Sequence, residues 1–126
     1  MTRLTKDKVL ALQKAVAKRT GKDSPVPDAA ALEAALATPF AHGADGADVF
    51  PSREEKAAKL GHELAAKRVF GTDGARMAMA VTLVFLEANG LTVDAPQDEV
   101  VITARALVNR RLRYDDLLVW ICRHAT

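Results

Sequence analysis

The sequence predicts an all-α protein, a compact bundle of about six helices, and two observations carry this prediction. Alanine is abundant among the 126 residues and aromatic residues make up only 5%, a composition that suits closely packed helices. Apolar side chains also recur with helical spacing along most of the chain. We therefore expect a single domain over residues 1–126 with one hydrophobic core.

Residues 76–88 are the most apolar stretch and are expected to form a buried central helix. Their apolar side chains fall on every side of a helical wheel, which is typical of a helix at the centre of a small domain. The turn Gly71-Thr72-Asp73-Gly74 precedes this helix, and Asn89-Gly90 ends it. The free N–H groups at its N-terminus can hold an anion, and Arg76 in the first turn has the right charge for that.

The other helices are expected around this one, and capping residues mark where they begin. Thr5 and Asp28 suit the first two helices, Ser52 and Glu55 form a capping box for the third, and Pro96 suits a first turn. The expected positions are 4–19, 28–37, 52–69, 96 to about 108, and 115–124. We expect the third helix to extend to Phe70 with Arg68 turned inward.

Residues 38–51 are the least regular part of the chain. They contain Pro39, Gly43, Gly46 and Pro51, which predict a loop or a short hairpin. A loop of this length inside a small domain is often functional.

Charge and cysteine content exclude several classes of protein. A net charge of +2 gives no argument for nucleic-acid binding, and no segment is long enough for a transmembrane helix. The N-terminal residues lack the apolar core and cleavage site of a secretory signal. The lone Cys122 rules out an internal disulfide, fits a reducing compartment and is interpreted as a small buried hydrophobe. We expect a cytoplasmic protein that binds neither nucleic acid nor membrane.

Three segments resemble the Fic/Doc (Fido) superfamily, in particular its short Doc, or death-on-curing, branch. The segment RTGKDSPVPDAAALEAALATPFA is similar to the Doc region in which a Gly-rich turn precedes an "LEsALarP" helix. FPSREEKAAKLGHELA is similar to its "yPtleeKAAaL" helix, and LVFLEANGLTV to the "FLxxNG" end of its central helix. The resemblance implies the Fido fold, in which a buried central helix follows the active-site loop.

The family signature in that loop, H-x-F-x-D-x-N-K-R in the Doc form, is largely replaced. The downstream FLEANG fixes an ungapped register, since a slip by one residue would need a compensating deletion. Only Phe70 and Arg76 keep the family residue. In this register Arg68 stands at the His position, Thr72 at Asp, Gly74 at Asn and Ala75 at Lys.

The resemblance implies a nucleotide-dependent transferase. In the family the His is the general base for a target hydroxyl, the acidic residue binds Mg²⁺, and the last three positions hold nucleotide phosphates. Most members transfer AMP to proteins, whereas the Doc branch transfers a phosphoryl group to a threonine of elongation factor Tu. The implied cofactor is ATP or another nucleotide with Mg²⁺, and the implied partners are an antitoxin peptide or a target protein.

The replacements change what this loop can do. Arg68 stays protonated and cannot act as a base, and Thr72 is a weaker Mg²⁺ ligand than a carboxylate. Asp73 is a candidate for Mg²⁺ binding or acid–base work, with an ordinary N-cap as the alternative. The candidate catalytic residues are therefore Asp73, Thr72 and Arg68. The candidate phosphate- or anion-binding residues are Arg76, Gly74, Ala75 and Arg68, with Phe70 as the structural anchor of the loop.

Histidines elsewhere give one candidate base. His42 lies in the irregular segment, where the family has a flap that holds the target peptide, and it is the outside candidate. We expect His62 to be a surface or boundary residue and His124 to be inert.

Three functional hypotheses remain open. The first is a Doc-like protein with a diverged loop that keeps a nucleotide or phosphate pocket and has weak or absent transfer activity. The second is a Fido-fold enzyme repurposed for a small anionic substrate, using Arg68, Asp73 and Arg76. The third is a non-catalytic protein-binding module that uses the basic residues Arg105, Arg110, Arg111 and Arg113.

Overall fold

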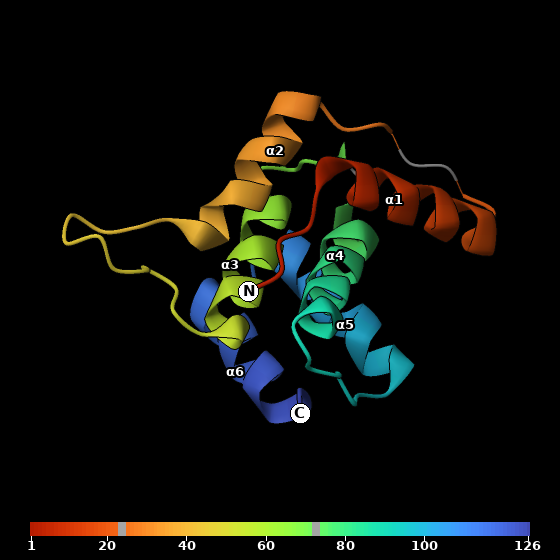
Figure 1. The fold of residues 1–126 in the computed structure, drawn as a ribbon. Coiled ribbons are helices and arrows are strands. Elements are labelled where there is room, and N and C mark those ends of the chain that lie inside the picture. The colour runs from red at the N-terminus through yellow and green to blue at the C-terminus, as the bar shows by residue number, and fades with distance from the viewer. Residues whose placement is uncertain (23–24, 72–73) are drawn as a thin grey trace.

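The structure, a computed structural model of the chain, describes residues 1–22, 25–71 and 74–126. In this part of the chain it contains six α-helices, one 3₁₀ turn and no β-strand beyond two isolated bridges, which confirms the predicted all-α bundle (Figure 1). The elements are α1 (Lys6–Thr20), α2 (Ala29–Ala37), η1 (Thr38–Phe40), α3 (Arg53–Ala66), α4 (Gly74–Ala88), α5 (Gln97–Val108) and α6 (Tyr114–His124).

The helix starts follow the predicted caps. The Thr5 hydroxyl accepts a hydrogen bond from the Lys8 N–H at 3.2 Å, and the Asp28 carboxylate accepts one from Ala31 at 2.9 Å. The predicted capping box is complete, because the Ser52 hydroxyl accepts from the Glu55 N–H while the Glu55 carboxylate accepts from the Ser52 N–H. Local chemistry therefore determines where these three helices begin.

The ends of α3 and α4 have the same geometry, which the sequence indicated for α4 but not for α3. After α4, Gly90 takes a left-handed conformation and the Leu91 N–H reaches back to the Leu86 carbonyl, as expected for a helix closed by glycine. After α3 the same pattern closes the helix at Ala66, with Arg68 in the left-handed position. The predictions that this helix reaches Phe70 and that Arg68 points inward are therefore wrong, and Arg68 is exposed.

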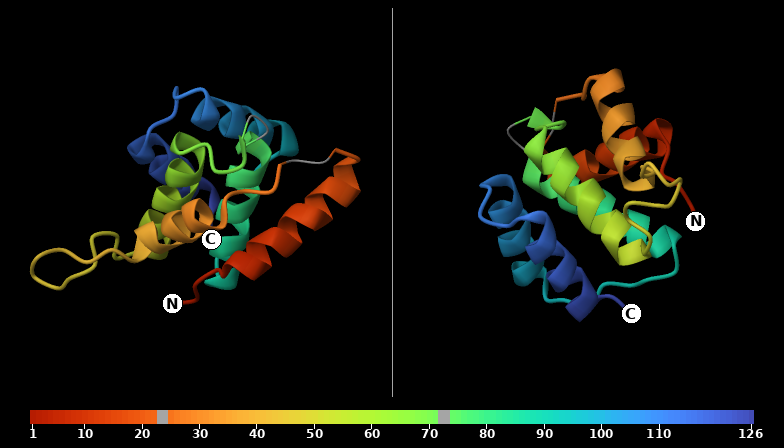
Figure 2. Two further views of the ribbon diagram at one scale, coloured as in Figure 1. Left: turned by 90° about the horizontal axis from the view of Figure 1, so that it is seen from above. Right: turned by 90° about the vertical axis from the view of Figure 1, so that its left-hand side faces the viewer.

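Side-chain contacts define the two ends of the bundle. At one end Arg53, at the start of α3, donates to the Asn89 carbonyl after α4, and His124 of α6 pairs with Glu99 of α5. The loop before α4 and the turn of residues 109–113 lie at the other end, which we call the loop end. In the right-hand view of Figure 2 the loop end is on the left and the C-terminus on the right.

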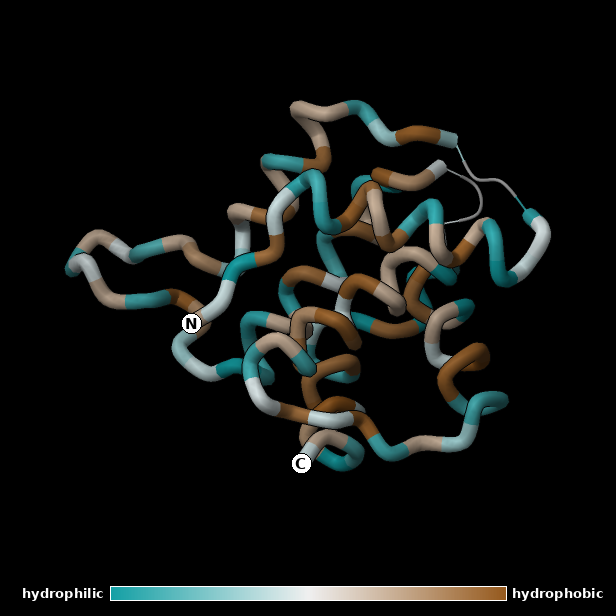
Figure 3. Tube along the Cα trace, turned by 45° about the vertical axis from the view of Figure 1, so that its right-hand side comes forward, coloured by the Kyte–Doolittle hydropathy of each residue, from teal (hydrophilic) through white to brown (hydrophobic). Residues whose placement is uncertain are grey.

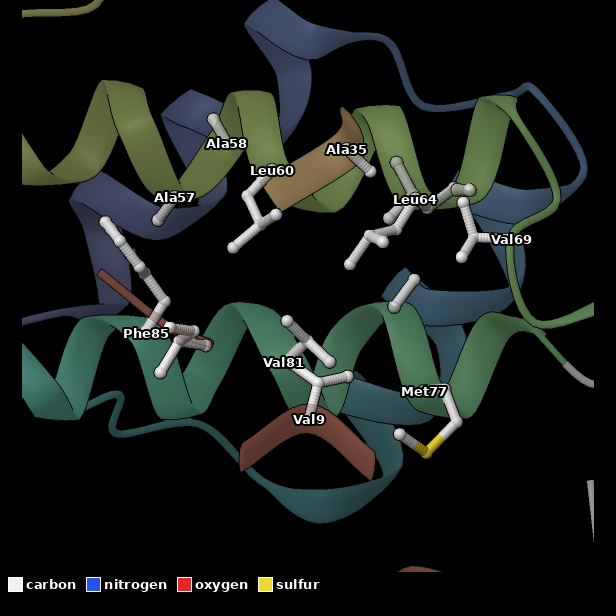
Figure 4. Close-up of a cluster of buried hydrophobic side chains, with 14 of the residues drawn as sticks. Val9, Ala35, Ala57, Ala58, Leu60, Leu64, Val69, Met77, Val81 and Phe85 are labelled. Carbon is white, nitrogen blue, oxygen red and sulfur yellow. The ribbon is translucent and has the colours of Figure 1, made fainter. Parts of the chain in front are cut away.

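Helix α4 lies in the centre of the core, as the sequence predicts. Figure 4 shows Leu60 and Leu64 of α3 on one side of it and Val9 of α1 on the other. Its buried residues include Met77, Val81 and Phe85, whereas Leu83 and Val84 are only half-buried. In Figure 3 hydrophobic residues recur within successive turns of the helices, the pattern of helices with one buried face.

Val101 and Cys122 are both exposed, and the prediction that Cys122 is a buried hydrophobe is wrong. Val101 of α5 is 39% exposed, because the buried face of this helix is formed by Thr103, Ala104 and Leu107 instead. Cys122 is exposed near the end of α6, where Leu117 and Ile121 occupy the inward positions.

Helices α3 and α4 approach each other closely at Gly61. A Cβ atom added at Gly61 would lie 2.4 Å from Oγ1 of Thr82 and 3.1 Å from a methyl carbon of Leu117 on α6. Thr82 is fully buried, and its hydroxyl donates to the Ala78 carbonyl at 2.7 Å. A glycine within a helix costs stability, so this close contact explains its presence in α3.

We predict that Gly61→Ala destabilises the protein by about 1–3 kcal/mol, because overpacking outweighs the gain in helix propensity. The double variant with Thr82→Ala removes the clashing oxygen and should recover most of this loss, which a double-mutant cycle by urea unfolding would measure. A higher unfolding midpoint for Gly61→Ala alone would contradict the close contact.

Candidate active-site loop

Arg68 is fixed by the end of α3 rather than by a partner side chain. Its φ angle is 48°, and its N–H donates to the Ala65 carbonyl at 3.2 Å while Val69 reaches Leu64 at 3.2 Å. Glycine usually occupies this position because a Cβ is unfavourable there. The structure therefore holds an exposed guanidinium at a backbone site where arginine costs stability.

Phe70 lies in the core directly before Gly71. Its side chain is 1% exposed and belongs to the hydrophobic core. The next residue, Gly71, lies near the segment before α2, since a Cβ there would be 3.6 Å from Pro25. Pro25 in turn accepts a hydrogen bond from the buried Gln13 of α1. The described part of the loop therefore packs against the core through Phe70 and lies next to the segment before α2 at Gly71.

The first turn of α4 differs in charge from most other helix starts. Asp or Glu residues stand in the first turns of α1, α3, α5 and α6, as expected near the positive end of a helix dipole. Helix α4 has no acidic residue in its first turn and instead begins Gly74-Ala75-Arg76. The N–H groups and the positive dipole end at such a helix start can bind an external anion.

The structure brings several of the predicted site residues to the loop end. Arg68 and Phe70 come directly before the loop, and Gly74, Ala75 and Arg76 follow it. Gly74 is buried, and Ala75 and Arg76 are half-buried. Thr72 and Asp73 lie outside the described residues.

The structure does not bring His42 to this loop. The segment 41–50 protrudes as a narrow hairpin next to the start of α3 (Figure 1), with one antiparallel bridge between His42 and Asp48. Arg68 follows the other end of the same helix, which spans 14 residues, or about 20 Å at the α-helical rise. The Nε2 atom of His42 instead lies 3.1 Å from Asp48.

A buried lysine joins this hairpin to α3, and the sequence interpretation missed it. Lys56 is 2% exposed, and its ammonium group donates to the Pro39 and Phe50 carbonyls and to Asp48. The spacing of Lys56, Leu60 and Leu64 is the signal that could have revealed it, because residues four apart share one helix face.

Other reactive side chains do not form a catalytic group in the described residues. Partial desolvation of the exposed Cys122 thiol, together with the charges of Glu54 and Glu55, raises its pKa, which favours the protonated and weakly nucleophilic form. The ring nitrogens of His124 face the Trp120 carbonyl at 2.7 Å and Glu99 at 3.0 Å, so this side chain links α6 to α5.

The four arginines of the predicted basic run lie at or near the loop end. Arg110 takes a left-handed conformation (φ 60°) after α5, and Arg111 donates its N–H to the Ala106 carbonyl, the same closure as at Arg68. Arg110, Arg111 and Arg113 are all exposed, as is Arg105 in the last turn of α5. Both non-glycine residues with positive φ in the described chain are therefore arginines at this end of the bundle.

Residues 1–22, 25–71 and 74–126 contain neither a candidate metal site nor a membrane-spanning helix. No group of three or more His, Cys, Asp or Glu residues there could hold a metal ion. No helix in that part of the chain is long and apolar enough to cross a membrane.

Comparisons with known proteins add no assignment. The chain matches no model of a known protein family, and it has no significant match among the curated proteins. The resemblance to the Doc branch therefore rests on the three quoted segments and on the register of the loop.

His62 gives the chain a pH-dependent contribution to stability. Burial lowers the pKa of His62 below its ordinary value; the charge of Lys59 adds to this shift and Glu63 opposes it. His62 therefore binds a proton more readily in the unfolded chain than in the folded one. Its contribution to the unfolding free energy is fully present above the ordinary pKa of 6.5 and is lost as the pH falls below that value.

We predict that His62→Gln lowers the sensitivity of the unfolding free energy to acid between about pH 7.5 and about pH 5.5. Urea unfolding at a series of pH values measures the difference from the wild type. Lys59→Gln removes the positive charge that also lowers the pKa of His62. The slope of its unfolding free energy against pH should lie between those of the wild type and His62→Gln. Identical slopes for the wild type and His62→Gln would contradict the assignment.

Proposed function

We propose that this protein is a Doc-like member of the Fic/Doc superfamily that binds a nucleotide or phosphate at the start of α4 and has weak or absent transfer activity. The observation that carries the proposal is the first turn of α4, which has no acidic residue, in contrast to the first turns of α1, α3, α5 and α6. A bound phosphate would accept hydrogen bonds from the N–H groups there and interact favourably with the positive end of the helix dipole.

Arg68 gives independent support to an anion at this place. Its left-handed backbone keeps an exposed guanidinium directly before the loop, in a conformation that costs stability for any residue with a Cβ. Such strain is concentrated at functional sites. Arg68 and Arg76 would bind phosphate oxygens from either side of the loop, and Phe70 would hold the loop in the core.

The described residues fit the phosphates of a nucleotide better than its metal ion. Backbone N–H groups and two arginines suit phosphate oxygens, whereas Mg²⁺ needs carboxylate or water oxygens. Asp73 is the candidate carboxylate. ATP with Mg²⁺ is thus the proposed cofactor on the family resemblance, and this chain's own contribution is to hold its phosphates.

The expected transfer of a phosphoryl or AMP group to a protein hydroxyl is weak. A guanidinium at position 68 cannot take the proton from a target hydroxyl. Loss of a general base typically lowers the rate by ~10²–10⁴. Since His42 lies at the hairpin rather than at the loop end, it does not replace the missing base. A repurposed enzyme that acts on a small anion with Arg68, Asp73 and Arg76 is the alternative use of the same loop.

A protein-binding module is the second candidate, and one observation favours it. Arg110 is held in a left-handed conformation beside the exposed Arg111 and Arg113, at the same end of the bundle as Arg68. A row of exposed arginines suits carboxylates on an acidic partner, such as an antitoxin peptide or a target protein.

We predict that Mg²⁺-ATP raises the melting temperature by about 4 °C at about ten times its dissociation constant. Arg76→Gln should abolish this shift, because it removes the cation nearest to the helix N-terminus. Arg68→Gly should weaken it while raising the melting temperature of the free protein. Arg19→Gln, an exposed arginine in the last turn of α1, is the control and should keep the full shift.

A panel of nucleotides and small phosphorylated or carboxylated metabolites separates the alternatives. A shift with a metabolite but with no nucleotide would favour the repurposed enzyme. No shift with any of these anions would contradict the proposed site and favour the protein-binding module. Intact-mass analysis of candidate target proteins then distinguishes AMP transfer from phosphoryl transfer.

A further inference from the structure

A polar hollow lies at the base of the hairpin, at the end of α3 opposite the loop end. Its volume is about 420 Å³, within the range of small-molecule sites. It is lined by Met1, Arg3, Phe40, His42, Asp48 and Lys56. The N-terminal segment, the hairpin and α3 therefore all contribute to it.

Lys56 brings a buried positive charge to this hollow. Its side chain is only 3% exposed, and Nζ lies 3.3 Å from the Pro39 carbonyl and 3.2 Å from Asp48. With the Phe50 carbonyl as the third acceptor, all three ammonium protons are used. Lys56 therefore holds these three acceptors in place around the hollow. Its positive charge acts on a ligand without a direct hydrogen bond.

Asp48 is satisfied on both oxygens. One oxygen accepts from Lys56 at 3.2 Å, and the other lies 3.1 Å from Nε2 of His42. The carboxylate is therefore already occupied by residues of the hollow, and it balances one of the positive charges there.

Arg3 supplies a second positive charge, and its guanidinium is already positioned. The guanidinium carbon lies 4.1 Å from the centre of the Phe40 ring, and Arg3 has no carboxylate partner within the described residues. The backbone beside it is fixed, because Thr2 and Asn89 exchange hydrogen bonds of 2.7 and 3.0 Å and Leu4 is buried.

We propose that this hollow is a second anion site that takes a small carboxylate or phosphate ligand. Arg3 and Lys56 carry two positive charges against the single charge of Asp48, so the hollow favours a negative ligand. The Arg3 guanidinium lies over the Phe40 ring, and its planar fork of N–H groups suits two oxygens of one oxyanion.

The proposal does not depend on the proposed function, and its test is separate from that of the loop end. The Arg76→Gln variant, which lacks the arginine of the first site, is titrated with inorganic phosphate and separately with malonate. Amide NMR spectra at low ionic strength report both the affinity and the place of binding. We expect saturable shifts at Thr2, Arg3 and His42 with a dissociation constant of about 1–10 mM.

Variants of Arg3 decide the outcome. Arg3→Gln should weaken binding by about tenfold or more, and Arg3→Lys by less, because it keeps the charge but loses the planar fork. Arg123→Gln, an exposed arginine in the last turn of α6, should bind as the parent does. A dispersed spectrum shows that each variant is folded.

Saturation with both probes supports a general oxyanion site, and saturation with one alone identifies the ligand as a phosphate or a carboxylate. Absence of saturable binding by either probe would overturn the proposal. Binding that Arg3→Gln leaves unchanged would overturn it as well, whatever the result for Mg²⁺-ATP at the loop end.

Discussion

The close contact between Gly61 of α3 and Thr82 of α4 is the constraint on which the rest of the structure depends. No side chain larger than hydrogen fits at position 61, since a Cβ would lie 2.4 Å from the threonine oxygen. This contact sets how α3 and α4 cross, and the two helices are joined by the loop of residues 67–73. The position of Arg68 relative to the start of α4 therefore follows from a packing contact in the middle of the core.

The helix ends Arg68 and Arg110 and the helix start Arg76 are all at the loop end, where the first turn of α6 also places Asp115 and Asp116. The first turns of α3 and α5 place acids at the opposite end. The two arginines in left-handed conformations destabilise the fold, and the packing of the core offsets this free-energy cost. A site for anions at the loop end is consistent with this arrangement. The positive charge of the hollow at the hairpin comes from other residues, Lys56 and Arg3.

Much of the fold could be predicted because its signals are local. The caps at Thr5, Asp28 and Ser52 act within one turn of a helix, and Gly90 ends α4 as its residue type suggests. The end of α3 could not be predicted, because Arg68 occupies a position that usually requires glycine. The cluster of Lys56, Asp48 and Arg3 could not be predicted either, because it joins segments whose contact depends on the tertiary fold. Exposure of Cys122 and Val101 depends on how α5 and α6 are rotated against the core.

Hydrogen–deuterium exchange with and without Mg²⁺-ATP tests most directly whether the start of α4 is an anion site. The account predicts slower exchange of the amides of Gly74, Ala75 and Arg76 when the nucleotide is bound, because phosphate oxygens would accept their hydrogen bonds. The same amides should exchange at an unchanged rate in the Arg76→Gln variant. Unchanged exchange at these residues in the wild type, with the nucleotide saturating, would contradict the account.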